Sequence, residues 1–375
     1  MKELEYPFDA AYIIKKRKSL KKALLADGTS RIRKKIAVFG GSTTSDIVKT
    51  LELFLLDAGI EPEFYESEYA QYFQDAMFPD ETLLSFKPDI VFIHTTNRNV
   101  TDWPEMTDTT EQIDEKLHTE INRFTAMWKS IAEKFHCPII QNNFEMPLYR
   151  LLGSRDAWDI HGRTNFLTRL NEAFYAYARE NESFYIHDLN FVSADYGLKE
   201  WSNPLFWNMY KYAMCFEAIP SFAFSVSHII KSIFGKNKKA LALDLDNTLW
   251  GGVVGDDGVD GIEIGQETGV SQSYYEFQTY VKQLKSLGIV LTVCSKNDHE
   301  NAIAGLNHPE GALRPDDFVI IKANWENKDR NIAETAAELN ILPDSIVFAD
   351  DNPAEREIVR TQIKGAAVPD MDGVE

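Results

Sequence analysis

The stretch LALDLDNTLW, residues 241–250, decides the fold of the C-terminal part of the chain. Its apolar first half is typical of a buried strand in a parallel sheet. Residues i and i+2 of a strand point to the same side, so we expect Asp244 and Asp246 to face one crevice where this strand ends. Open α/β sheets bind ligands at the carboxyl ends of their strands. The sequence therefore predicts that this acidic pair is functional.

Apolar runs and amphipathic stretches alternate along the whole chain, which predicts an α/β fold of two doubly wound domains. The first series of strands is expected near residues 36–40, 63–67, 89–95, 138–143 and 183–189, with helices around 44–58, 111–134 and 164–180. The second is expected near 239–245, 289–295, 317–321 and 345–350, with helices around 272–287, 297–305, 327–339 and 353–362. A polar segment at 234–239 separates the two series. We therefore predict a helical arm at 1–30 and domains at 31–236 and 237–375.

The overall charge is strongly negative, −19 from 39 basic and 58 acidic residues, and such a field repels nucleic acid and anionic lipid. One basic run interrupts it, formed by Lys15, Lys16, Arg17, Lys18, Lys21 and Lys22 and continued by Arg31, Arg33, Lys34 and Lys35. The run is either a solvated helix face or an electrostatic dock for an acidic partner.

Membrane and secretory segments are not evident, because no apolar stretch approaches the roughly 20 residues of a membrane span. The start, MKELEYPFDA, also lacks the apolar core of a secretion signal. The three cysteines, Cys137, Cys215 and Cys294, show neither disulfide nor zinc-ligand spacing. We expect a cytoplasmic protein without a membrane or nucleic-acid partner.

Two neighbouring carboxylates such as Asp244 and Asp246 favour a hard cation, and Mg²⁺ would relieve their repulsion and bridge to a phosphate oxygen. One carboxylate is then free to attack phosphorus, while the other passes protons to and from the leaving group and water. The alternative is a solvated, acidic turn at a strand end.

Three later strand ends carry residues that suit phosphoryl transfer. Ser295 follows one strand, with Lys296 and Asn297 opening a helix whose backbone amides suit phosphate. Lys328 opens another helix, where its ammonium could neutralise a transferring phosphoryl group. The pair Asp350 and Asp351 follows the last strand and offers further metal carboxylates. Taken singly, these are a helix cap, a surface charge and a second helix cap; together they favour a site.

At these four strand ends the sequence resembles the haloacid dehalogenase (HAD) superfamily of phosphohydrolases and phosphotransferases, over roughly residues 237–370. The resemblance implies that Asp244 is a nucleophile forming an aspartyl phosphate and Asp246 the general acid and base. Ser295 and Lys328 would bind the phosphoryl group, and Mg²⁺ would lie on Asp244, the Asp246 carbonyl and Asp351, with Asp350 a less certain ligand. The spacings leave no room for the superfamily's cap domain, so we expect an open site.

The segments LDNTLWGGVVGDDGVDGIEIG, VCSKND, NWENKDRNI and FADDNPAERE are similar to the FkbH-like branch of uncapped members. Several members take a glyceryl unit from 1,3-bisphosphoglycerate, lose a phosphate and load the acid onto the phosphopantetheine thiol of an acyl carrier protein. The resemblance thus implies a phosphorylated small molecule and a carrier protein as partners. Cys294 is either a transient acyl acceptor, activated at a helix N-terminus, or a small apolar residue ending a buried strand.

In the N-terminal half, FGGST (39–43) follows the first strand, which places Ser42 on a tight turn with backbone amides nearby. It resembles the first block of SGNH-type hydrolases, and Asn97 could stand for that family's oxyanion-hole asparagine. No DxxH occurs between 140 and 235, so His161, or else His187, is left as a substitute base. A serine without a positioned base loses most of its reactivity, and a docking or lid role is the alternative.

Three functions follow from these features. The first is a Mg²⁺-dependent phosphatase or phosphotransferase at Asp244, with glyceryl transfer as its specific form. The second is an esterase or acyl transferase at Ser42 with a regulatory C-terminal half. The third is a non-catalytic scaffold in a biosynthetic assembly.

Overall fold

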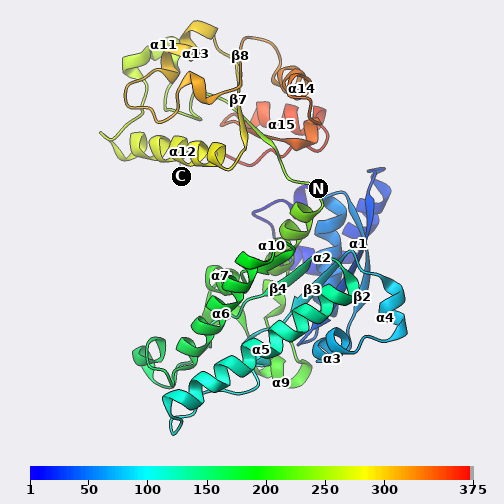
Figure 1. The fold of residues 1–375 in the computed structure, drawn as a ribbon. Coiled ribbons are helices and arrows are strands. Elements are labelled where there is room, and N and C mark those ends of the chain that lie inside the picture. The colour runs from blue at the N-terminus through cyan, green and yellow to red at the C-terminus, as the bar shows by residue number, and fades with distance from the viewer. Residues whose placement is uncertain (372–375) are drawn as a thin grey trace. The chain divides into compact units, whose positions relative to one another are not determined.

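The computed structural model describes residues 1–371, and the chain divides into two compact units, Met1–Gly235 and Lys236–Glu375 (Figure 1). Each unit is built on a parallel sheet with helices on both faces. The predicted α/β class with two doubly wound sheets is confirmed.

The first unit contains a five-stranded sheet in the order β2-β1-β3-β4-β5. Its strands are β1 (Ile32–Gly40), β2 (Ile60–Glu66), β3 (Ile90–His94), β4 (Ile139–Asn142) and β5 (Phe184–His187). Its helices are α1 (Ala10–Ala26), α2 (Ser45–Asp57), α3 (Tyr72–Met77), α4 (Glu81–Phe86), α5 (Thr110–Phe135), α6 (Arg163–Glu180), α7 (Leu189–Tyr196), α8 (Leu198–Trp201), α9 (Pro204–Tyr210) and α10 (Ile219–Ile233).

Alternate residues of the central strands feed two separate cores. Val38 and Phe92 pack with α1, α2 and α10 on one face, whereas Phe39 and Ile93 pack with α5 and α6 on the other (Figure 1). This is the two-residue period of a strand buried on both sides. All five strands end at one edge, where the loops that follow β1, β3 and β4 gather.

The second unit contains a four-stranded parallel sheet in the order β8-β7-β6-β9. Its strands are β6 (Ala240–Leu243), β7 (Val290–Ser295), β8 (Ile320–Ala323) and β9 (Ile346–Ala349). Its helices are α11 (Val254–Asp257), α12 (Gly269–Ser286), α13 (His299–Leu306), α14 (Lys328–Glu338) and α15 (Pro353–Gln362). Between Asp246 and α12 the described chain forms only short turns and α11, so no cap domain is inserted there.

Two local differences from the sequence-based expectation have clear causes. Strand β8 begins at Ile320 instead of near 317, because Pro315–Asp317 forms a short 3-10 turn. Residues near the N-terminus do not stand apart as an arm: Ile13, Leu20 and Leu24 of α1 are buried in the core that α2 and α10 share.

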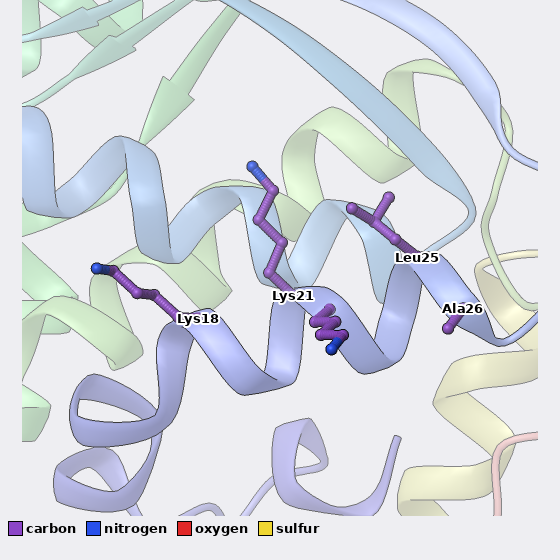
Figure 2. A pocket seen from close by; sticks show the side chains of 5 residues that line it. Lys18, Lys21, Leu25 and Ala26 are labelled. Carbon is purple, nitrogen blue, oxygen red and sulfur yellow. The ribbon is translucent and has the colours of Figure 1, made fainter.

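The basic run on α1 is partly neutralised within its own unit. Arg17 forms an ion pair with Asp46 at 2.6 Å, and Lys21 with Glu52 at 2.7 Å. Lys18, Lys21, Lys22, Leu25 and Ala26 line a surface hollow of about 370 Å³ along this helix (Figure 2). All of these lining residues belong to α1, so the hollow brings no other chemistry to the run. None of the described helices combines the length and apolarity that a bilayer crossing requires.

Candidate functional site

The acidic pair lies directly after β6, the strand between β7 and β9. The Asp244 amide donates to the Ala349 carbonyl of β9 at 2.9 Å, so this residue continues the sheet before the chain turns. Asn247 then adopts a left-handed backbone conformation, φ +55°, which asparagine tolerates better than most residues. Its Oδ1 accepts from the Gly252 amide at 3.0 Å and closes the turn. The DLDNT sequence therefore leaves the sheet at a fixed point.

A buried lysine lies between two carboxylates from different strand ends. Lys328 Nζ lies 3.0 Å from Asp244 Oδ2 and 2.5 Å from Asp350 Oδ2. The exposed fractions of the three side chains are 3%, 10% and 0%, respectively. The first turn of α14 and the ends of β6 and β9 thus converge, as expected for carboxyl ends of neighbouring parallel strands.

The pKa values of these groups depend on burial and on one another. Burial alone would lower the pKa of Lys328, but the Asp244 and Asp350 carboxylates outweigh it and raise that pKa. Burial, followed by the Asp244 charge, raises the pKa of Asp350 and of Asp351. The cluster therefore carries more acidic groups than its lysine can balance.

These carboxylates fit a divalent cation. One oxygen each of Asp244, Asp350 and Asp351 lies within 4.8 Å of the others. Asp244 Oδ1 is buried without a hydrogen-bond partner among the described residues, so one lone-pair position is left for a ligand. Oxygen donors of this kind are what Mg²⁺ binds.

Asp246 is held by three donors. Trp250 Nε1 and the Val254 amide donate to its Oδ1 at 2.9 and 3.0 Å, and Asn297 Nδ2 donates to its Oδ2 at 2.9 Å. Burial raises the pKa of Asp246 despite the hydrogen bonds, and the charge of Asp244 adds to the rise. The side chain is thus fixed in position beside the cluster.

The residues predicted to bind phosphate have different surroundings in the structure. Ser295 ends β7 and is buried, and Asn297 contacts Asp246. Lys296 instead forms an ion pair with Glu355 of α15 at 2.6 Å. The helix α13 begins at His299, two residues later than expected.

Cys294 is 1% exposed and belongs to an apolar cluster on the α14 side of the sheet. Its thiol donates to the Lys328 carbonyl at 3.6 Å. The lowered thiol pKa that the acyl-acceptor hypothesis required is not found, because burial raises the pKa of Cys294 to about 12. The environment is that of the apolar strand residue that was the alternative.

Sequence reasoning missed the residues that fix the loop after β9. Thr248 Oγ1 accepts from the Asp351 amide at 3.2 Å. Arg356 Nη1 donates to the carbonyls of Asp350, Asp351 and Met371 at 2.9, 2.7 and 3.0 Å. Arg356 is 3% exposed, and its position six residues after Asp350 on an opening helix was the available signal.

The residues predicted for a second site in the first unit are not joined by hydrogen bonds. Ser42 is 2% exposed, and its Oγ has no partner among the described residues. His161 contacts Asp159 Oδ1 at 2.9 Å and the Asp108 carbonyl at 3.1 Å. Asn97 donates to the Glu145 carbonyl at 3.3 Å.

His187 lies in a buried polar cluster, and its ring nitrogens contact residues other than Ser42. It contacts Asn142 Oδ1 at 2.9 Å and Ser225 Oγ at 3.0 Å. Burial lowers the pKa of His187 and of the buried His94 to about 3 each. Among the described residues, no histidine forms a hydrogen bond with Ser42 that would activate it as a nucleophile. Hydrolysis at Ser42 therefore stays a prediction.

Comparison with known proteins finds a matching family and a similar crystal structure. Residues 35–231 match the family described as FkbH, N-terminal domain. The crystal structure of the N-terminal part of the protein BF1531 from Bacteroides fragilis, containing a phosphatase domain and complexed with Mg, is 31% identical. The match covers 95% of this chain and 93% of that chain, with a TM-score of 0.84.

Other solved structures resemble this chain only weakly. A GDSL-like lipase from Bacteroides thetaiotaomicron is 13% identical over 60% of this chain and 98% of that chain, with a TM-score of 0.29. The catalytic domain of a peptidoglycan O-acetyltransferase from Streptococcus pneumoniae is 11% identical over 56% and 97%, also with a TM-score of 0.29. Among curated proteins, no match to this chain was found.

Proposed function

The chain belongs to the FkbH family, and from this premise we propose that it is a Mg²⁺-dependent phosphatase or phosphotransferase of the HAD type. Its substrate is a phosphorylated small molecule, and its nucleophile is Asp244. One observation supports this above the others: Asp244 has a buried oxygen without a partner beside Lys328 and two further carboxylates. The similar part of BF1531, which contains a phosphatase domain, was crystallised with Mg.

In the first step, a carboxylate oxygen of Asp244 attacks the phosphorus of the substrate. A P–O bond forms on Asp244 as the bond to the leaving oxygen breaks, which gives an aspartyl phosphate. Lys328, 3.0 Å from Asp244, keeps the nucleophile oriented and balances negative charge on the phosphoryl oxygens. Asp244, Asp350 or Asp351, and the Asp246 carbonyl would hold Mg²⁺, which when bound supplies charge that offsets anion repulsion.

Asp246 moves the protons in both steps. As an acid it donates a proton to the leaving oxygen, and as a base it then takes one from the incoming water or acceptor hydroxyl. Its three donors, from Trp250, Val254 and Asn297, hold the carboxyl in place through both steps. Release of phosphate from Asp244 regenerates the carboxylate.

The narrower reaction, glyceryl transfer from 1,3-bisphosphoglycerate to an acyl carrier protein, rests on family membership alone. Its test is the mass of a carrier protein incubated with the chain, Mg²⁺ and the bisphosphate. A carrier that gains one glyceryl unit supports the transfer. If the mass of the carrier is unchanged and phosphate is released, the chain acts as a phosphatase and does not transfer the glyceryl unit.

The decisive experiment measures phosphate release from aryl and three-carbon phosphates by the full chain. Asp244→Asn should lower the rate by about 10³-fold or more, because the substitution removes the attacking oxygen's charge. EDTA should abolish the rate and Mg²⁺ should restore it. The matched control is Asp316→Asn, an exposed aspartate of the same unit, which should retain the full rate. Equal rates in both variants would refute the assignment of Asp244.

A further inference from the structure

A cavity in the first unit lies outside the acidic site and has chemistry of its own. It measures about 290 Å³ and is lined by the loops after β3 and β4, the start of α6 and the segment around α8 and α9. Its lining includes two arginines, a glutamate and three tryptophans: Arg98, Arg163, Glu145, Trp103, Trp201 and Trp207. Its volume is near the lower end for small-molecule sites, roughly 300 Å³, so it suits a small ligand.

Two arginines of this cavity each lie over a tryptophan ring. The guanidinium carbon of Arg98 lies 5.2 Å from the ring centre of Trp207, and that of Arg163 lies 4.9 Å from the ring centre of Trp103. Neither guanidinium forms an ion pair with a carboxylate in the part of the chain that the structure describes. Such a cation–π contact needs no hydrogen bond from the guanidinium, so its N–H donors stay available to an oxyanion.

The turn that carries Arg98 is anchored firmly. Asn99 Oδ1 accepts from the Thr96 amide at 3.0 Å, and Asn99 Nδ2 donates to the Gly41 carbonyl at 2.9 Å. A Cβ on Gly41 would lie 2.4 Å from Asn99 Oδ1, which shows how closely the β1 loop and this turn approach. The backbone from which Arg98 projects is therefore fixed by these contacts before any ligand arrives.

The carboxyl group in the cavity does not cancel these cations. Glu145 is 4% exposed, and its Oε2 accepts from the Asn97 amide at 3.1 Å. Burial raises the pKa of Glu145 to about 8, although the Asn97 hydrogen bond and Arg98 oppose the rise. The neutral carboxyl form is thus favoured at neutral pH, and the cavity is positive within a chain of net charge −19.

A further donor on the wall lacks an acceptor. Trp201 is 1% exposed, and its indole N–H has no hydrogen-bond partner among the described residues. An unsatisfied buried donor is costly, and an acceptor oxygen of a ligand would remove that cost. The lining of the cavity thus combines two cations, aromatic surface and a buried indole N–H without a partner among the described residues.

We propose that this cavity is a binding site for a small phosphate monoester, with the phosphoryl oxygens between Arg98 and Arg163. Two guanidinium groups match the charge of a phosphate monoester, about −1.5 to −2 at pH 7, better than the single charge of a carboxylate. The carbon skeleton of the ligand packs against the tryptophans. All the lining residues belong to the first unit, whereas Asp244 belongs to the second.

The test is calorimetric titration of the full chain in EDTA, at low salt, with glycerol 3-phosphate and inorganic phosphate as probes. Arg98→Gln and Arg163→Gln should each weaken binding of glycerol 3-phosphate by at least about tenfold, since a charge-assisted hydrogen bond is lost. Arg179→Gln is the matched control, because Arg179 is an exposed arginine at the far end of the same helix α6. It should bind like the parent chain.

Arg98 and Arg163 are both exposed, so the two variants are expected to fold. Each variant is therefore a separate test of whether its arginine binds the phosphate. Equal affinity in the parent and all three variants would place the phosphate elsewhere and overturn the proposal. No binding by the parent at millimolar probe would also overturn it. Acetate binding as tightly as glycerol 3-phosphate would overturn the assignment to phosphate.

Discussion

Replacing Lys328 by methionine gives the sharpest test of the site's electrostatics. The change removes the ammonium that lies 3.0 Å from Asp244 and 2.5 Å from Asp350, and it leaves two carboxylates with little access to water. Removing one partner of a buried ion pair costs about 3–5 kcal/mol, because the remaining charge is uncompensated. We therefore expect Lys328→Met to lower the free energy of unfolding of the second unit by about 3–5 kcal/mol.

A matched control exists in the same unit. Lys322 also contacts two carboxylates, Glu334 at 3.3 Å and Glu338 at 2.6 Å, but these glutamates are about half exposed, 46% and 52%. Water screens such surface pairs. Lys322→Met should therefore change stability far less than Lys328→Met.

The assay is hydrogen exchange read by mass spectrometry across β6, because a chain with two units has no single two-state transition. Adding Asp350→Asn to Lys328→Met should recover part of the loss, since it removes one stranded charge. Mg²⁺ should stabilise Lys328→Met more than it stabilises the Lys322→Met control. Equal losses in the two lysine variants would refute the reasoning.

Three further predictions follow from the described contacts. In the parent, Glu145 has a pKa of about 8 when folded and about 4.5 when unfolded, so the parent loses stability as pH rises between these values. Glu145→Gln cannot ionise, so its stability relative to the parent should increase over the same pH range. Urea titrations at several pH values measure the difference. His94 and His187 have pKa values of about 3 in the folded chain, so they stabilise the fold above pH 6.5 and lose this contribution as pH falls. His187→Gln should therefore make the free energy of unfolding fall less steeply between pH 6.5 and 3. An unchanged slope in this pH range would contradict the argument. Asn297→Ala should lower turnover about tenfold by freeing one oxygen of Asp246, with the pH–rate profile shifted; an unshifted profile would assign Asn297 a purely structural role.

The sequence was a good guide where one local pattern decided the outcome. The apolar run before Asp244 is a central strand, and the acidic pair at 350–351 lies at the end of its neighbour β9. The charged start of β1 was missed, because Arg33, Lys34 and Lys35 do not resemble a buried strand. These residues extend β1 beyond β3 and pair with β2 alone, where Arg33 contacts Glu61 across the strands.

Contacts between distant segments could not be predicted from local sequence patterns. The ion pair of Lys296 with Glu355 joins residues 59 apart, and it places the lysine differently from the predicted phosphate contact. The cavity of Arg98 and Arg163 draws on four separated segments, and neither arginine belongs to a motif that the sequence analysis identified. Helical or strand periodicity reports burial along one element and does not report which loops meet at a sheet edge.

Arg356 has a practical consequence for engineering this protein. Its guanidinium connects the backbone of the Asp350–Asp351 loop to the carbonyl of Met371, twenty residues further along the chain. A shortened clone or a fusion joint placed just before Met371 would remove one anchor of that guanidinium. Such a product would keep every acidic side chain of the proposed site, but the Asp350–Asp351 loop would be held less firmly, so expression boundaries belong beyond Met371.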